Sequence, residues 1–186
     1  MRIMVNFGHG GSDFGACYNG LRESEINKII GTTLANYLKS YGYDVTTFQQ
    51  TQSVNDVWRA ENKSKYDILV SIHCNAFNST ANGHEVLYYP TSDDGKKLAQ
   101  CIQTSLVNVV GLRDRGVKPR EDLAVLKRTK TVAVIVETAF ISNPNEAKLL
   151  RDEPDLFAKA IAVGVKNYFG NQDTRNTQCT CDCHKI

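Results

Sequence analysis

The chain has 186 residues, of which 41% are hydrophobic and 23% charged, so it is long enough to bury the core of a single globular domain. A formal net charge of +2 gives no strong electrostatic case for nucleic acid or an anionic membrane as a partner. The sequence also contains no run near the roughly 20 apolar residues that a membrane-spanning helix requires. We therefore expect a monomer that binds neither nucleic acid nor membrane.

Apolar periodicity and turn residues divide the chain into alternating strands and helices. In chain order we predict a strand over residues 2–7, a helix over 24–41, a strand over 44–48, a helix over 54–65, strands over 67–72 and 84–89, a helix over 92–110, a charged surface loop over 112–123, strands over 124–126 and 131–136, and helices over 145–150 and 155–169. This alternation predicts an α/β fold of three layers, in which a twisted, mostly parallel sheet of about six strands is flanked by helices on both faces.

The two ends of the chain differ in character. Residues 2–7 are too short for a signal peptide and lack a small-residue cleavage site, so we expect a protein made in the cytoplasm, unless an upstream export segment is missing. From residue 171 the composition becomes polar, which predicts a folded domain over 1–170 and a disordered, cysteine-rich tail over 171–186.

The cysteines do not indicate a disulfide scaffold. Those in the body of the chain are scattered, which favours reduced thiols. Cys179, Cys181 and Cys183 crowd beside His184, but their spacing is too tight for an ordinary structural zinc pair. We interpret them as incidental thiols of a disordered tail, with loose metal binding or oxidation outside the cell as the alternatives.

Two histidines and a glutamate each follow a predicted strand. His9 comes after the first strand, His73 ends the run over 67–72, and Glu137 ends the run over 131–136. Because ligand sites form at the carboxyl ends of strands in open α/β sheets, these side chains are expected on one edge. Two imidazoles and one carboxylate with an open fourth position are typical of a hydrolytic zinc enzyme. A hydrolytic site also needs a second carboxylate that transfers protons. Glu23 and Glu25, which follow the glycine-rich turn, and Glu137 are the candidates for the ligand and for this proton-transferring group.

Each histidine taken alone is more often a structural residue, and the case for a site rests on an ordered set of motifs. The set contains, in chain order, Gly8-His9-Gly10-Gly11-Ser12-Asp13-Phe14-Gly15-Ala16, Gly20-Leu21-Arg22-Glu23-Ser24-Glu25-Ile26-Asn27, Arg59 with Asn62, Ser71-Ile72-His73-Cys74-Asn75-Ala76, Gly83-His84-Glu85-Val86, Arg115-Gly116-Val117-Lys118, Leu126-Lys127 and Val136-Glu137-Thr138-Ala139-Phe140-Ile141-Ser142-Asn143. This set resembles the zinc-dependent N-acetylmuramoyl-L-alanine amidases, type 3, across residues 1–169.

The resemblance implies a role for each of the four site residues. It implies zinc ligands at His9, Glu23 and His73 and a catalytic glutamate at Glu137. Glu23 is preferred over Glu25 because the family's ligand carboxylate lies four positions before an asparagine. The implied reaction is hydrolysis of the amide between the lactyl group of N-acetylmuramic acid and L-alanine of the stem peptide. Zinc-activated water would attack, with the catalytic glutamate as general base and acid.

Three further residues are candidates for holding substrate. Arg59 and Arg115 can bind substrate carboxylates, but structural salt bridges explain them equally well. Asn75 can orient His73 or contact glycan.

His84 is expected on the surface or on an edge strand. The glycine-rich turn lacks the lysine and hydroxyl residue of a phosphate-binding loop, so a nucleotide site is disfavoured.

The resemblance suggests a cell-lysis enzyme, either a phage endolysin or a bacterial autolysin, that acts on peptidoglycan at the bacterial cell wall after release. One rival is a zinc peptidase that cuts another bond of the stem peptide with the same metal chemistry. A second rival is a wall-binding module that has kept the fold and lost the chemistry, which the four filled positions argue against. Departures from the family pattern, such as Asn6-Phe7 and Thr138-Ala139, leave the implied ligands in place.

Overall fold

The computed structural model describes residues 1–51 and 53–178. Its strands are β1 (Arg2–Phe7), β2 (Cys17–Tyr18), β3 (Leu21–Arg22), β4 (Asp44–Gln49), β5 (Ile68–Asn75), β6 (His84–Tyr88), β7 (Asp114–Pro119) and β8 (Val132–Phe140). Its helices are α1 (Glu23–Ser40), α2 (Val54–Asn62), α3 (Asp93–Val110), α4 (Ala124–Arg128), α5 (Pro144–Asp152) and α6 (Pro154–Gln178).

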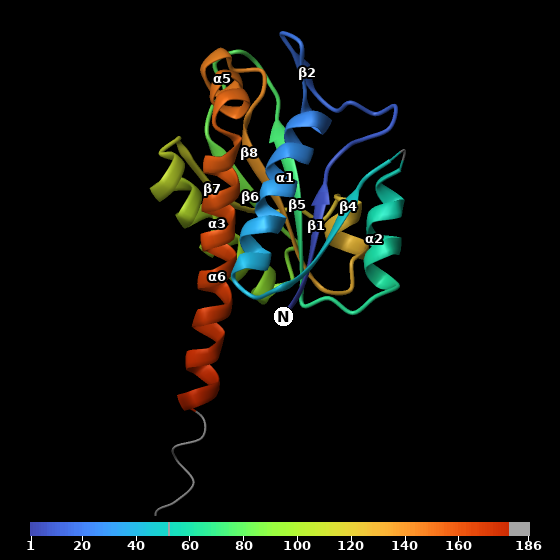
Figure 1. Ribbon diagram of the computed structural model, residues 1–186, viewed down its shortest axis with the longest axis vertical. Helices are drawn as coiled ribbons and strands as arrows, with labels where there is room; N and C mark the ends of the chain where they lie inside the picture. The colour runs from blue at the N-terminus through green and yellow to red at the C-terminus, as the bar shows by residue number, and fades with distance from the viewer. Residues whose placement is uncertain (52, 179–186) are drawn as a thin grey trace, which may run out of the picture.

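Six strands form the central sheet, in the order β4-β1-β5-β8-β6-β7. Strands β4, β1, β5 and β8 are parallel, whereas β6 is antiparallel to β8 and parallel to β7. The carboxyl ends of β1, β5 and β8 therefore share one edge of the sheet, at the end of the molecule where β2 and α5 lie (Figure 1). We call this the carboxyl edge and the opposite one the amino edge. The predicted fold class is confirmed.

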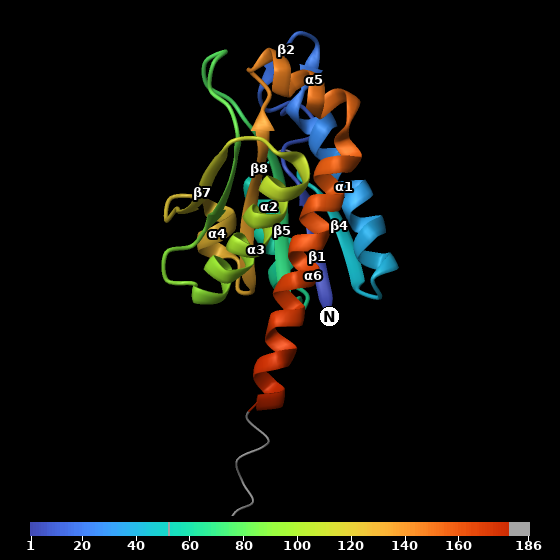
Figure 2. The same cartoon turned by 90° about the vertical axis from the view of Figure 1, so that its left-hand side faces the viewer.

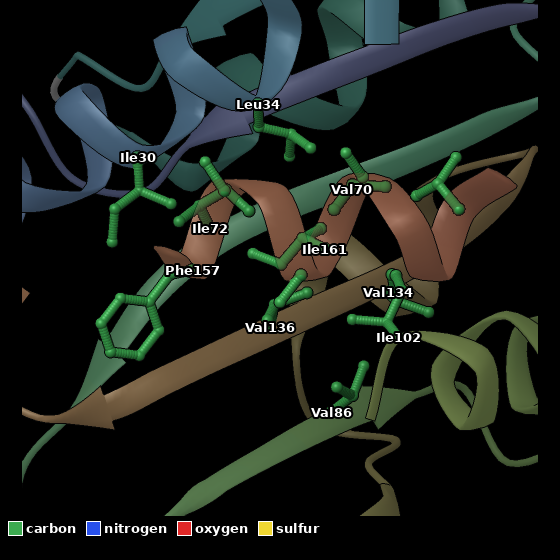
Figure 3. Packing of buried hydrophobic residues seen from close by; sticks show 14 of the residues in the cluster. Ile30, Leu34, Val70, Ile72, Val86, Ile102, Val134, Val136, Phe157 and Ile161 are labelled. Carbon is green, nitrogen blue, oxygen red and sulfur yellow. The ribbon is translucent and has the colours of Figure 1, made fainter. Parts of the chain in front are cut away.

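Alternate strand residues bury their side chains on opposite faces, which produces two hydrophobic clusters. The larger cluster joins the sheet to α1, α3 and α6, and Figure 3 shows Ile30 of α1 beside Ile72, Ile102 of α3 beside Val134, and Ile161 of α6 above Val136. The smaller cluster packs Met4 and Leu69 against α2 and α4 on the other face. Helices thus cover both faces and leave the carboxyl edge open for chemistry (Figures 1 and 2).

Two elements differ from the sequence-based expectation. The segment over 112–123, predicted as a loop, contains β7, which pairs with β6 at the margin of the sheet. Its residues are charged and only half-buried, so they show no apolar alternation. The segment over 124–126, predicted as a strand, is instead the start of α4, whose Val125 and Leu126 pack onto the sheet. Three apolar residues are too few to separate a strand from a helix by periodicity.

Other expectations concern His84, the end of the chain, the cysteines and membrane-spanning helices. His84 is fully buried, because β6 lies between β8 and β7, so its prediction as a surface or edge-strand residue was wrong. Helix α6 continues to Gln178 and thus includes the first part of the predicted tail. Cys179, Cys181, Cys183 and His184 lie outside the described residues. Cys17 and Cys74 are free thiols. Among the helices of the described residues, none has the length and hydropathy of a membrane span.

Candidate metal centre

His9 follows directly on the buried strand β1, in a tight turn at the carboxyl edge. Its backbone has a φ of 60°, a conformation that non-glycine residues rarely adopt. Gln49 at the end of β4 donates from Nε2 to the carbonyl of His9 at 2.5 Å and thereby fixes the turn against the sheet. The imidazole is held from both sides, since Nδ1 lies 2.8 Å from Asp13 Oδ2 and Nε2 lies 3.3 Å from Glu23 Oε1.

Glu23 is the first residue of α1, and the β2–β3 hairpin that precedes this helix positions it at the site. The hairpin turns at Asn19 and Gly20, which both have positive φ, as a two-residue type I′ turn requires. The buried Glu23 carboxylate accepts hydrogen bonds from the backbone N–H groups of Ala16 at 2.9 Å and Cys74 at 3.1 Å. Asn27, one helical turn later, donates to the carbonyl of Gly8 at 3.0 Å and lies 3.4 Å from Glu23 Oε1. The choice of Glu23 over Glu25 agrees with this geometry.

His73 brings the third side chain from β5. Its Nδ1 lies 3.1 Å from Glu23 Oε1, and its ring meets the ring of His9 edge-on with centroids 5.1 Å apart. One ligand atom from each of His9, Glu23 and His73 lies within 4.8 Å of the others. The structure thus brings together three segments that are far apart in the sequence.

Two glycines clear the space that this convergence needs. A Cβ on Gly8 would overlap Cε1 of the His73 ring, closer than non-bonded carbon atoms can approach. A Cβ on Gly15 would lie 2.6 Å from Glu23 Oε2 and 2.7 Å from Cδ2 of His9. The glycine-rich turn therefore makes room for the side chains of the site.

The donor set fits a zinc ion. Two imidazole nitrogens and one carboxylate oxygen are ligand types of catalytic zinc, with a fourth position left for water or substrate. Zn–N distances of about 2.0–2.1 Å place tetrahedral ligand atoms roughly 3.3 Å apart. The separations of 3.3 Å and 3.1 Å between Glu23 Oε1 and the nitrogens of His9 and His73 match this spacing.

The charges of the site also favour a cation. The hydrogen bond to Glu23 raises the pKa of His9 to about 9, with Asp13 adding to the effect and burial opposing it. Burial would raise the pKa of Glu23, but the hydrogen bonds with His73 and His9 outweigh it and hold that pKa far below its usual value. The carboxylate is thus charged at neutral pH and attracts positive charge to the point where the nitrogens converge.

Asp13 also belongs to the site, although no role was predicted for it from the sequence. Its Oδ2 faces His9 Nδ1 at 2.8 Å, and its Oδ1 accepts from the backbone N–H of Gly15 at 3.0 Å. The hydrogen bond with His9 is the main reason that the pKa of Asp13 is lowered. A carboxylate on the far nitrogen of a metal-binding histidine fixes its tautomer and ring orientation. The signal in the sequence was an aspartate four residues after the histidine within one glycine-rich turn.

Glu137 lies beside this cluster on β8. It is the direct register partner of His73 on β5 and of Glu85 on β6, so the three side chains point to the same face of the sheet. Its Oε2 is buried and has no hydrogen-bond partner among the described residues. Burial raises the pKa of Glu137 to about 7, against the opposing charge of His73. The group is therefore poised to exchange a proton near neutral pH.

A hollow of about 560 Å³ opens next to this row and contains two of the three predicted substrate residues. Asn75, Phe77, Glu85, Arg113, Arg115 and Phe140 contribute to its lining. Glu85 accepts from Asn75 Nδ2 at 3.1 Å and from Arg115 Nε at 2.8 Å, and it pairs with Lys118 Nζ at 2.9 Å. Asn75 thus bonds Glu85 rather than orienting His73, and the salt bridge weighed as the alternative for Arg115 is present.

Arg59 does not join the hollow. Its guanidinium lies 5.3 Å from the centre of the Trp58 ring on α2, and Arg128 approaches the same ring at 5.5 Å. Helix α2 runs from the carboxyl edge back toward the amino edge, where β5 begins. A residue in its second half is therefore carried away from the site.

Comparisons with known proteins agree with this geometry. A match to the family described as N-acetylmuramoyl-L-alanine amidase covers residues 3–167. N-acetylmuramoyl-L-alanine amidase LytC of Bacillus subtilis (strain 168) is 35% identical over 175 residues, which cover 90% of this chain and only 35% of that protein. This chain thus spans about a third of the length of that relative.

Two solved structures superpose closely on the fold. The crystal structure of N-acetylmuramoyl-L-alanine amidase from Clostridium difficile 630 gives a TM-score of 0.84 at 32% identity, covering 92% of this chain and 97% of that one. The CwlD amidase from Clostridioides difficile, solved in complex with the GerS lipoprotein, gives 0.86 at 31% identity, covering 91% and 98%.

Proposed function

Because this chain belongs to the N-acetylmuramoyl-L-alanine amidase family, we propose that it is a peptidoglycan hydrolase. The bond cleaved is the amide between the lactyl group of N-acetylmuramic acid and L-alanine of the stem peptide. One observation carries the proposal: the ligand atoms of His9, Glu23 and His73 converge beside the unpartnered Oε2 of Glu137. The protein acts at the bacterial cell wall, as a cell-lysis enzyme of the endolysin or autolysin kind.

His9, Glu23 and His73 hold a zinc ion in this proposal. Zinc bound there supplies Lewis-acid polarisation of the scissile carbonyl and makes water a nucleophile at neutral pH. Asp13 would hold a proton on His9 Nδ1, so that Nε2, once it has lost its own proton, would act as the ligand. Ala16, Asn27 and the backbone of Cys74 keep the carboxylate of Glu23 aimed at the same point.

Glu137 carries the proton in the reaction. Its carboxylate takes a proton from the attacking water at Oε2 and later gives it to the nitrogen of the leaving L-alanine. The raised pKa of about 7 suits both roles, since the group can accept and release a proton at neutral pH. The charge of the neighbouring Glu85 is compensated by Arg115 and Lys118, which limits its repulsion of Glu137.

The hollow beside Glu137 is the site that we assign to the stem peptide. Asn75 and Arg115 line it, as does Arg113, whose exposed guanidinium forms no ion pair within the described part of the chain. Phe77 offers an aromatic ring that is 79% exposed. The guanidinium groups can bind a peptide carboxylate, and the aromatic ring can pack against a nearby aliphatic side chain of the same peptide.

Matched substitutions test the metal site and the base separately. Glu23→Gln is expected to lose stoichiometric zinc after dialysis, whereas the exposed Glu25→Gln control keeps it, as measured by elemental analysis. Glu137→Gln is expected to keep zinc and to lower turnover of a soluble muramyl peptide by about 10²–10⁴-fold. Turnover at the wild-type rate in Glu137→Gln would contradict the assignment of the base.

The identity of the bond is tested on purified cell wall by mass spectrometry. Free lactyl groups and new N-terminal alanine are expected. Shortened stems on intact muramyl peptides would instead support the zinc peptidase, and an unchanged wall would support the non-catalytic binding module.

A further inference from the structure

The amino edge of the sheet, opposite the metal centre, carries a concentration of positive charge. Two short segments supply it, residues 63–65 after α2 and residues 127–130 at the end of α4. We call the group the basic edge, and its members are Lys63, Lys65, Lys127, Arg128 and Lys130, all of them exposed.

Hydrogen bonds fix the two segments side by side. Asn62 donates from Nδ2 to the carbonyl of Arg128 at 3.0 Å and accepts at Oδ1 from the backbone N–H of Lys130 at 3.1 Å. Thr131 donates from Oγ1 to the carbonyl of Tyr66 at 2.8 Å, and Arg2 donates to the carbonyl of Lys65 at 2.7 Å. The positive charges are therefore held on a rigid part of the fold.

The basic edge is not neutralised by the protein itself. Within the described residues none of its five members forms an ion pair, although Arg128 lies over Trp58. Burial raises the pKa of the neighbouring Glu61, whose carboxylate accepts a hydrogen bond from the backbone N–H of Lys130. The nearby acids are engaged elsewhere. Asp44 pairs with Arg2 and Asp94 with Lys97, while Asp67 accepts from the backbone N–H of Arg2. The exposed charges of the basic edge are therefore available to bind an external anion.

A hollow of about 320 Å³ adjoins the basic edge and has the chemistry of a polyol phosphate site. Lys127 and Lys130 line it together with the hydroxyl residues Tyr89, Thr91, Ser92, Thr129 and Thr131. It also adjoins the first turn of α3, where Ser92 accepts from the backbone N–H of Gly95 at 3.0 Å. Ammonium groups recognise phosphate, and hydroxyl groups hydrogen-bond the hydroxyls of a polyol.

We propose that the basic edge binds a polyanionic chain of polyol phosphates, the kind of phosphodiester polymer that accompanies peptidoglycan in a cell wall. This choice of partner rests on the proposed function at the wall. The polymer binds on the edge opposite His9, Glu23 and His73, so it tethers the enzyme without covering the metal centre (Figure 1). Repeated phosphates along a flexible chain can engage several lysines at once.

A membrane surface fits the basic edge less well. Proteins that lie on anionic membranes combine basic residues with apolar or aromatic side chains that enter the headgroup region. The exposed large apolar residues of the described chain are Met1, Phe14, Ile29, Val54 and Phe77, and of these only Met1, which directly precedes β1, lies at this edge. Hydroxyl groups instead line the adjoining hollow.

The test uses the full chain and two matched triple variants. One removes charge from the basic edge, Lys65→Gln with Lys127→Gln and Lys130→Gln. The control removes the same charge from exposed lysines of α1 and α6, Lys28→Gln with Lys39→Gln and Lys159→Gln. Lipid-free poly(glycerol phosphate) and phosphatidylglycerol vesicles are the two probes, with binding measured by co-sedimentation or titration calorimetry at low and high salt.

We expect the wild type and the control to bind poly(glycerol phosphate) in a salt-sensitive manner, and the basic-edge variant to bind at least about tenfold more weakly. Equal losses in the two variants would overturn the proposal, because binding would then follow net charge. Binding of vesicles but not of the polymer, or of neither, would overturn it as well. Turnover of a soluble muramyl peptide should be unchanged in the basic-edge variant. A wild type that binds polymer without cleaving this peptide would refute the proposed function and not the docking site.

Discussion

Asp13 is the residue whose role is most open to a direct test, because it touches the proposed metal centre only through His9. Asp13→Asn keeps the size of the side chain and replaces the carboxylate oxygen that faces His9 Nδ1 at 2.8 Å. If the amide nitrogen takes that place, His9 must accept there and carry its proton on Nε2, the atom needed for zinc. If the amide oxygen takes it, the NH₂ group faces the backbone N–H of Gly15 and that hydrogen bond is lost.

Both outcomes weaken zinc binding by a predictable amount. Loss of a carboxylate behind a metal-binding histidine typically lowers metal affinity 10–100-fold, or about 1.4–2.7 kcal/mol. The side chains of His9 and Asp13 are 25% and 44% exposed, so water can replace part of the lost interaction. The expected loss is therefore in the lower part of that range, about 10–30-fold.

A chelator competition measures this affinity without any need for enzyme activity. Wild type, Asp13→Asn and the control Asp94→Asn are titrated with zinc against an indicator of known affinity at one pH. Asp94 is an exposed acid paired with Lys97 on α3, so its substitution leaves the metal centre untouched. If Asp13→Asn bound zinc within twofold of the wild type while unfolding at the same temperature, the tautomer argument would be refuted.

Three further predictions concern stability. Gly164→Ala should destabilise the fold by about 1–3 kcal/mol in urea unfolding, because its Cβ would lie 2.5 Å from Cα of Ile102 and force α3 and α6 apart. Gly170→Ala, on the same helix with nothing within 4 Å, should stabilise it by about 0.5–1 kcal/mol. Burial would raise the pKa of Glu85, but Lys118 and Arg115 lower it, so its contribution is present above pH 4.5 and is lost as pH falls. Glu85→Gln should therefore destabilise by about 1–3 kcal/mol at pH 7 and by less at pH 4.

Most of the fold was predictable because its parallel strands are buried on both faces. The run over residues 68–72 is apolar apart from Ser71, and the sheet covered by helices follows from the alternation of such runs with amphipathic segments. Strand β7 was missed because it lies at the margin and has no buried face to impose a pattern. His84 was misplaced for a related reason, since the pairing of β6 with β7 makes β6 an interior strand and depends on an element that the pattern does not reveal.

For the candidate metal site, too, some residues could be predicted from local sequence patterns and others could not. His9, His73 and Glu137 were predicted to lie together because each ends a recognisable strand and parallel strands end at one edge, and the structure has the three strand ends at that edge. Glu23 required the resemblance, since its position depends on the hairpin that precedes α1. The order of the motifs did not predict that Arg59 lies away from the site. It lies there because α2 runs away from the carboxyl edge and Arg59 is in the second half of that helix.

The glycine-rich turn shows why a local motif can be assigned the wrong physical role. In the sequence, glycines between a strand and a helix are also typical of a phosphate cradle, where they let backbone N–H groups face an anion. Here Gly8 and Gly15 lack side chains because the space is filled by His73, His9 and Glu23 themselves. Any residue with a Cβ at either position would displace a proposed ligand, so these two positions are as restrictive as those of the ligands. The requirement is steric, and for Gly8 it depends on His73, which lies 65 residues further along the chain, so only the folded chain reveals it.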